Sequence, residues 1–389
     1  MKLRDKIKCT GCGACVNICP KRCISMKQDK EGFCYPVIEE SACIGCKKCE
    51  KVCGNLDVQK NNIPQSAHIG YSKKYQMDGS SGGIIGELAK CVLEDGVVYG
   101  AAFADDFSVE HIRVETLTDL PQIFKSKYTQ SRVGDSFINV KKDLENNKNV
   151  LFTGTSCQIA GLNAFLGKKY ENLITVEMIC HGVPSPGIWQ SYLKERANER
   201  SIEDVNFRDK RISWNKFCIS MKFSDGSEYC SVAGEDDYMK RFLGDYILRS
   251  SCYNCEFRGV KRVADITLGD AWCEKKVLSK LPQYTNGVSS VIINSKKGLE
   301  LFQKTQEKLY FVKVHFSEAI GYNNSYFLSP FRPTSRKSMK VGVENVTEIP
   351  SSHSKKDKLL YFIYRVKAKL LCLILKKRMD RNEKNFDNY

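Results

Sequence analysis

The sequence predicts three parts: a small, cysteine-rich α+β domain, a larger mixed α/β domain and a C-terminal basic helix. A cysteine pattern that occurs twice within residues 1–57 indicates the first part. Strand-like and helix-like stretches that alternate from Ala67 onward indicate the second. Apolar residues at helical spacing, interrupted by lysine and arginine, indicate the third. We expect domains at 1–57 and 66–330 (an N-terminal part 66–148 and a C-terminal part 149–330), a linker at 331–358 and the helix at 359–378.

Two cysteine runs with the spacing CxxCxxCxxxC open the chain, the first followed by Pro20 and the second by Gly54. Three thiolates on a tight loop reach three corners of a cubane cluster, and the fourth cysteine of each run completes the other cubane. The sequence therefore predicts a ferredoxin-like domain with two 4Fe-4S clusters. One is held by Cys9, Cys12, Cys15 and Cys53, and the other by Cys43, Cys46, Cys49 and Cys19.

Zinc and disulfides are the alternatives for these cysteines. Structural zinc usually takes two CxxC pairs with a longer insert and does not require a duplicated four-cysteine run. Gly11, Gly13 and Gly45 fit a cluster, because small residues let backbone amides approach its sulfurs.

Composition indicates a globular protein in a reducing compartment. The chain has 389 residues and 42% hydrophobic content, enough for two or three domains. Nineteen cysteines favour a compartment without disulfide formation, and residues 1–8 carry four basic residues but no apolar signal segment. We expect a cytoplasmic location.

The net charge of +16 is concentrated near the C-terminus. Residues 355–378 contribute +8 of it. No nucleic-acid-binding motif accompanies this charge, so we expect no nucleic-acid partner. An amphipathic basic helix at 359–378 can lie on an anionic membrane surface, and it can equally dock on the protein itself or on a partner.

In the larger domain, a strand at 68–71, a helix at 83–94 and a strand at 97–103 come first. The loop Asp78–Gly83, rich in glycine and serine, precedes the helix. It offers amides and hydroxyls at a positive helix end, which suits a phosphate or a flavin edge. A plain helix cap is the alternative.

Two further cysteines are predicted at the ends of buried strands. A buried strand that begins at 149 leads through a tight Thr153-Gly154-Thr155 turn into a helix with Cys157 at its start, and the strand 173–179 ends at Cys180. In a βαβ unit both positions fall at the carboxyl edge of the sheet, where ligands bind.

The rest of this domain contains a hairpin, a CxxC pair and further strands and a helix. The hairpin arms 217–223 and 228–232 carry Cys218 and Cys230, which we interpret as core cysteines. Cys252-x-x-Cys255 suits a zinc pair, a redox dithiol or half of a cluster site. With Cys157 and Cys180 it supplies four thiolates, but spacing alone does not decide whether they form one site. Strands at 264–272, 287–294 and 310–316 and a helix at 296–308 complete the domain.

Five motifs in order resemble the coenzyme F-420 hydrogenase/dehydrogenase β-subunit family, in its form with an N-terminal two-cluster ferredoxin domain. The resemblance covers residues 1–330. The motifs are Ser80-Ser81-Gly82-Gly83, residues 125–131 (KSKYTQS), 153–158 (TGTSCQ), 180–186 (CHGVPSP), and Cys252-x-x-Cys255 running into 264–272 (ADITLGDAW).

This resemblance implies FAD and a third 4Fe-4S cluster in a mixed α/β flavin and iron-sulfur core domain. The implied cluster ligands are Cys157, Cys180, Cys252 and Cys255. The implied FAD-binding residues are Ser80, Ser81, Gly82, Gly83, Lys125, Ser126, Lys127, Tyr128, Gln130 and Ser131. The family commonly has proline where this chain has Ser156. Cationic residues that can offset cofactor charge are Lys125, Lys127, Arg258, Lys261 and Arg262.

The expected function is that of an iron-sulfur flavoprotein oxidoreductase. It passes electrons between a hydride donor or acceptor at FAD and three clusters, with a redox partner protein or soluble carrier at the outer end. The alternative is an electron-transfer adaptor that carries the ferredoxin clusters without flavin catalysis. The sequence names no catalytic acid or base and leaves open whether the deazaflavin coenzyme is used.

Overall fold

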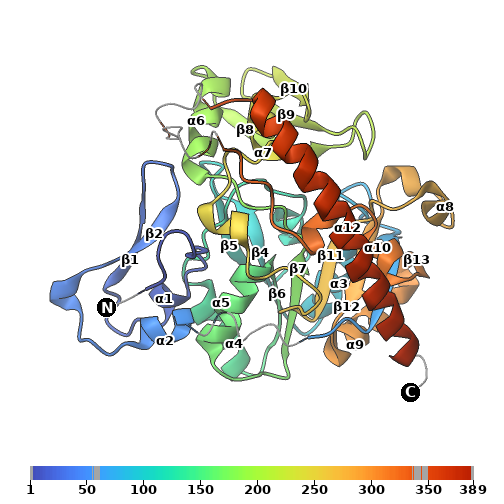
Figure 1. Ribbon diagram of the computed structural model, residues 1–389. Coiled ribbons are helices and arrows are strands. Elements are labelled where there is room, and N and C mark those ends of the chain that lie inside the picture. Colours follow the sequence, from blue (N-terminus) through green and yellow to red (C-terminus); the bar gives the residue numbers. More distant parts are fainter. Residues whose placement is uncertain are drawn as a thin grey trace.

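An eight-stranded mixed sheet forms the centre of the molecule (Figure 1). The computed structural model describes residues 3–54, 56, 62–334, 336, 343 and 349–386, with the backbone alone for 381–386. The strand order is β13-β3-β12-β11-β7-β6-β4-β5, in which β4, β6, β7 and β11 run parallel and the other pairs are antiparallel. The strands are β3 (Ser66–Ser72), β4 (Gly96–Phe103), β5 (Val109–Val114), β6 (Asn149–Thr155), β7 (Leu173–Met178), β11 (Ile266–Asp270), β12 (Ser289–Ile293) and β13 (Leu309–Lys313).

Helices cover both faces of this sheet because its strands are apolar on both sides. Tyr99 and Phe152 belong to a core shared with α4 and α5, whereas their neighbours Val98 and Leu151 pack with α3 and α9. This alternation is expected for strands buried on both faces. The helices are α3 (Ile84–Leu93), α4 (Ser136–Glu145), α5 (Ser156–Leu166) and α9 (Lys296–Thr305), with α8 (Lys275–Leu278) and α10 (Phe316–Ile320) nearer the β13 end.

The N-terminal part docks on α4 and α5 (Figure 1). It contains α1 (Ala14–Asn17), the antiparallel hairpin of β1 (Ile24–Gln28) and β2 (Cys34–Ile38), and α2 (Lys48–Gly54). Ala14 and Val52 belong to the same apolar cluster as Phe137 and Ile159. A segment this short buries little surface alone, and here it shares the core of the larger part.

A second, three-stranded sheet has the order β10-β9-β8. It comprises β8 (Ile202–Asp209), β9 (Cys218–Phe223) and β10 (Glu228–Val232) and packs with α6 (Pro186–Ala197) and α7 (Asp237–Leu243). The predicted hairpin is confirmed as β9 and β10. Cys218 is buried as predicted, but the prediction for Cys230 is wrong: Cys230 is exposed, because β10 is the outer strand of this sheet.

The C-terminal helix α12 (Lys355–Phe386) is longer than the predicted 359–378 and crosses the outside of the molecule toward α10 (Figure 1). Ala368, Cys372 and Met379 of this helix are buried. Of the predicted linker 331–358, residues 335, 337–342 and 344–348 lie outside the described part. Arg336 and Ile349, which are described, are buried.

The coarse fold class is confirmed: a small N-terminal α+β part, a mixed α/β part and a C-terminal helix. Short 3-10 helices connect these elements at Glu40–Ala42 (η1), Leu120–Ile123 (η3), Ser250–Asn254 (η4), Tyr284–Asn286 (η5), Gln306–Lys308 (η6) and Asn324–Tyr326 (η7).

Replacement of Gly83, which precedes α3, should destabilise the fold. Gly83 has φ +70°, and an added Cβ would lie 2.1 Å from the Tyr75 carbonyl oxygen. We expect Gly83→Ala to lower the free energy of unfolding by about 1–3 kcal/mol, measured by urea denaturation. Gly234→Ala is the control, since its Cβ meets no atom within 4 Å. Equal stability of the two variants would contradict this account.

Candidate metal and cofactor centre

The first cysteine set consists of Cys9, Cys12, Cys15 and Cys53, which line one cavity together with Met26 and Pro36. Cys9 and Cys12 lie on the loop before α1, Cys15 on α1 and Cys53 on α2. The loop can turn around the cavity because Gly11 and Gly13 adopt φ +69° and +78°. Four thiols that converge on an otherwise largely apolar cavity fit the ligand set of a cubane cluster.

Burial and mutual repulsion act on the thiols of this set. Burial raises the pKa of Cys12 and Cys15, and the nearby thiolates of Cys9 and Cys53 raise both further. Bound iron would reverse this effect, because metal ligation removes the thiol protons.

The second set, Cys43, Cys46, Cys49 and Cys19, is nearer the surface. Cys46 is exposed. Burial is the largest cause of the raised pKa of Cys49, and the nearby Cys19 raises it further. Cys23, one of two cysteines of this region outside the two runs, lies with its Sγ 3.4 Å from the Cys19 Sγ. The hydrogen bond to Cys19 is the largest of the effects that raise the pKa of Cys23 to about 11. No spacing rule pointed to Cys23.

The third set brings together Cys157, Cys180, Cys252 and Cys255. Cys157 begins α5 after β6, and Cys180 follows β7, so both lie at the carboxyl edge of neighbouring parallel strands. Cys252 lies on η4, and Cys255 follows it. Burial raises the pKa of Cys157 well above its ordinary value, and the thiolates of Cys255, Cys180 and Cys252 add to this. The four side chains are therefore close neighbours.

Within the described residues, no three Cys, His, Asp or Glu side chains are close enough to hold a single metal ion. A tetrahedral zinc site with bonds of about 2.3 Å needs its sulfurs about 3.8 Å apart. The thiolates of a cubane bind separate iron atoms and stand farther apart.

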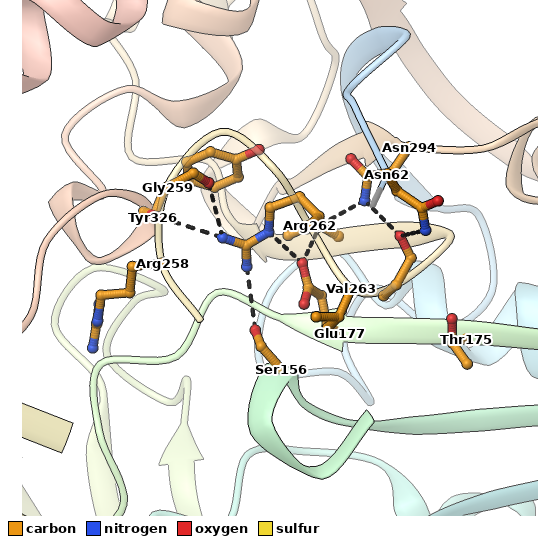
Figure 2. A network of polar contacts seen from close by, with 12 residues as sticks. Asn62, Ser156, Thr175, Glu177, Arg258, Gly259, Arg262, Val263, Asn294 and Tyr326 are labelled. Atoms are coloured by element: carbon orange, nitrogen blue, oxygen red, sulfur yellow. Dashed lines mark hydrogen bonds and ion pairs between the residues drawn. The ribbon is translucent and has the colours of Figure 1, made fainter. Parts of the chain in front are cut away.

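A buried ion pair supports the third set (Figure 2). The Arg262 guanidinium pairs with Glu177 on β7, and both side chains are almost fully buried. Arg262 also donates to the Ser156 hydroxyl at 3.3 Å, directly before Cys157, and lies over the Tyr326 ring. Ser156 stands where the family that the sequence resembles commonly has proline. Its hydroxyl accepts a hydrogen bond that a proline side chain could not accept.

Arg258 is the second cation at this set, and its charge opposes the effect of burial on the pKa of Cys180. Its guanidinium donates to the carbonyl oxygen of His181 at 2.7 Å. Lys261, which the sequence grouped with these two arginines, is exposed.

The two loops predicted to bind FAD meet in the structure. The backbone amide of Ser126 donates to the Ser80 hydroxyl at 2.6 Å. Arg208 on β8 donates to the Ser80 carbonyl oxygen and to the Tyr128 hydroxyl, and it pairs with Asp270 at the end of β11. Lys210 donates to the Ser81 carbonyl oxygen. Sequence reasoning missed both cations, since β8 was not predicted.

Positive charge is in excess around these loops. Burial, then the neighbouring Arg208 and Lys125, lower the pKa of Lys210 to about 8, although Asp270 opposes this. Burial and Lys125 lower the pKa of Lys127 to about 7. A bound anion would favour the charged form of both lysines, so these cations fit the pyrophosphate of FAD.

Several predicted FAD residues already have protein partners. The Lys127 ammonium donates to the carbonyl oxygens of Phe124 and Gln122. The Gln130 amide donates to Thr10 in the loop of the first cysteine set, and the Ser131 hydroxyl accepts from Gln158. Gly82 and Gly83 pack against backbone, where an added Cβ would clash with Gly70 and Tyr75. Lys125 is exposed.

Comparisons with known proteins agree with this architecture. Residues 147–318 match the family model for the C terminus of the coenzyme F420 hydrogenase/dehydrogenase beta subunit, and residues 8–55 match the 4Fe-4S dicluster domain. The chain is 22% identical over 332 residues to one subunit of the F(420)H(2) dehydrogenase of Methanosarcina mazei, covering 77% of this chain and 88% of that protein.

A second relative is the coenzyme F420-dependent sulfite reductase of Methanocaldococcus jannaschii, 26% identical over 186 residues. This match covers 46% of the present chain and only 28% of the sulfite reductase. Among solved structures, the F420-reducing [NiFe] hydrogenase complex of Methanosarcina barkeri contains a chain that aligns with a TM-score of 0.46 and 16% identity, over 74% of this chain and 93% of that chain.

A dicluster domain joined to this α/β core defines an iron-sulfur protein of the electron-transfer class. More specifically, residues 147–318 are similar to the C terminus of coenzyme F420 hydrogenase/dehydrogenase beta subunits, which confirms the resemblance seen in the sequence.

Loss of Arg262 should be costly because it leaves the Glu177 carboxylate buried without its cation. We expect Arg262→Met to lower the free energy of unfolding by about 3–5 kcal/mol. The double variant Arg262→Met/Glu177→Leu should recover most of this loss, since an apolar pair replaces an ion pair of similar volume. Urea denaturation of both proteins measures the difference. If the double variant were as unstable as the single one, the uncompensated charge would not be the cause.

Proposed function

We propose that this protein is an iron-sulfur flavoprotein oxidoreductase with two 4Fe-4S clusters in residues 1–57, and one 4Fe-4S cluster and one FAD in residues 66–330. The observation that supports this most is the convergence of Cys157, Cys180, Cys252 and Cys255 from three separate segments of the chain. A fold has no structural need for four partly buried thiols at one point, whereas a cluster requires them.

The bound cofactors would supply hydride chemistry at the flavin and one-electron chemistry at the clusters. The side chains of this chain bind and orient them. Arg208 and Lys210 offset the charge of the FAD phosphates beside Ser80 and Ser81. Arg258 and Arg262 offset the charge of the third cysteine set. The twelve cysteines that the sequence singled out are the metal ligands.

For the substrate we propose a deazaflavin-type hydride donor or acceptor, because both named relatives carry F420 in their names. At the other end we propose a redox partner protein or soluble carrier that docks near the exposed Cys46 of the second set. The abundance of cysteine supports a cytoplasmic location.

An electron-transfer adaptor without flavin is the second candidate. One observation favours it: the Lys127, Gln130 and Ser131 side chains already bind protein atoms. The adaptor would hold about eight iron atoms instead of about twelve, at four for each cubane.

Iron and flavin content separate the two candidates. Anaerobically reconstituted protein should contain about twelve iron atoms and one FAD per chain, at four iron atoms for each cubane. The double variant Cys252→Ser/Cys255→Ser should fall to about eight iron atoms, because it removes two ligands of one cubane. Cys91→Ser, on α3 away from the three sets, is the control. About eight iron atoms and no FAD in the unaltered protein would reject the oxidoreductase.

We also propose that α12 contacts an anionic membrane surface. No helix among the described residues is long and apolar enough to cross a bilayer. The outer face of α12 carries an exposed apolar stripe at helical spacing, formed by Leu359, Phe362, Ile363, Val366, Leu370, Leu373 and Ile374. Exposed basic residues flank the stripe on both sides, as in helices that lie flat on anionic lipid: Lys358, Arg365 and Lys369 on one side, Lys356, Lys367 and Arg378 on the other.

Vesicle binding tests this contact. The protein should cosediment with vesicles that contain phosphatidylglycerol and bind less as salt is raised. Leu370→Asp/Ile374→Asp should abolish binding, because it places charge in the stripe. Leu117→Asp, at an exposed apolar residue outside α12, should not. If the unaltered protein stayed in solution at low salt, the face would serve a protein partner instead.

A further inference from the structure

Arg249 is a fully buried arginine that reaches the first cysteine set. Its Nε donates to the Cys9 carbonyl oxygen at 2.7 Å, and one terminal nitrogen donates to the Cys34 carbonyl oxygen at 3.1 Å and lies 3.6 Å from the Cys9 Sγ. The other terminal nitrogen donates to the Gln130 side chain at 2.9 Å. The guanidinium also lies 4.1 Å from the centre of the Tyr35 ring.

All these partners are neutral groups, the Cys9 thiol included. In the described part of the chain, no carboxylate forms an ion pair with Arg249. A buried cation is costly unless negative charge compensates it. The Cys9 sulfur is the group in contact with Arg249 that becomes negative when the set binds iron. The burial of Arg249 is therefore explained by a charged ligand set in the adjacent cavity.

The backbone of Arg249 also forms hydrogen bonds with the loops of the third cysteine set. Its amide donates to the carbonyl oxygen of Val183, which follows Cys180 closely, and its own carbonyl oxygen accepts from the Cys252 amide. The Pro184 carbonyl oxygen in turn accepts from the Gln130 backbone amide. One arginine thus connects the loops of two cysteine sets.

Two further contacts place these sets side by side. An added Cβ at Gly161 on α5, one turn after Cys157, would lie 3.0 Å from the Cys12 Sγ. Arg4 donates to the Cys53 carbonyl oxygen and pairs with Glu256, the residue after Cys255. The Cys9 set is therefore the inner one, and the Cys43 set, with its exposed Cys46, is the outer one.

We propose that Arg249 is a positioning residue that raises the reduction potential of the cluster at the Cys9 set, so that this set is the inner electron acceptor beside the third set. This inference rests on the proposed function for the presence of the clusters. One electron passed from the third set would form no bond, and the cluster together with its cysteine ligands would gain one negative charge. A fixed cation and its hydrogen bond to the cysteine sulfur stabilise that added charge.

Three variants separate the charge of Arg249 from its structural contacts. Arg249→Gln removes the charge and keeps an amide donor, whereas Arg249→Lys keeps the charge. Gln130→Glu retains the arginine but places a carboxylate against it. It therefore tests the effect of charge even if the Arg249→Gln variant does not fold. Arg241→Met is the control, because Arg241 is a buried arginine that binds the Ile349 carbonyl oxygen.

The measurement is an anaerobic redox titration followed by electron paramagnetic resonance on the reconstituted full chain. In Arg249→Gln and Gln130→Glu, one cluster should become at least about tenfold harder to reduce, which is about 59 mV for one electron. Arg249→Lys should shift the reduction potential much less than Arg249→Gln does. Arg241→Met should have the same reduction potentials as the unaltered protein.

Failure of the proposed function and failure of the inference about Arg249 would give different results. If the unaltered protein gave no cluster signals, the proposed function would fail. If cluster signals were present but neither Arg249→Gln nor Gln130→Glu changed any reduction potential, the inference would be overturned. It would also be overturned if Arg249→Lys and Arg249→Gln shifted a cluster's reduction potential equally, because charge at Arg249 would then not set that potential.

Discussion

In the proposed function, the negative charge of the cysteine ligands is the constraint on which the rest of this structure depends. Cysteine sulfurs bind iron only when they are deprotonated, and burial raises the cost of that charge. The protein offsets this cost with two buried arginines, Arg249 and Arg262, and the partly buried Arg258. Arg249 lies against the first set, and Arg258 and Arg262 lie against the third. Each arginine is held by carbonyl oxygens, aromatic rings or one buried carboxylate.

The parallel part of the sheet explains how the third set can form. Strands β6 and β7 run side by side, so the residues that follow them emerge at the same edge. Cys157 and Cys180 occupy these two positions, and Asp270 ends β11, the next parallel strand. The Arg208 that pairs with Asp270 also binds the loop of Ser80. The candidate flavin loops and the third set therefore meet at one edge of one sheet.

The sequence predicted the elements whose signals are local. The β6-α5-β7 unit, the hairpin of β9 and β10 and the C-terminal helix follow from short-range periodicity, and all are present. It did not predict the roles of single arginines. Arg249 is three residues from Cys252, yet nothing in that spacing shows that its side chain turns toward Cys9. Gln130 was assigned to FAD by resemblance, whereas its side chain binds Thr10 and Arg249, a contact that only the tertiary fold creates.

In the proposed function, three separate cysteine sets hold iron in one chain. Anomalous scattering at the iron absorption edge, from crystals of anaerobically reconstituted protein, tests it most directly. The account predicts three iron positions: at the Cys9 set, at the Cys43 set and at the Cys157 set, with the first between the other two. Iron at the first two sets alone, with four free thiols at Cys157, Cys180, Cys252 and Cys255, would contradict it.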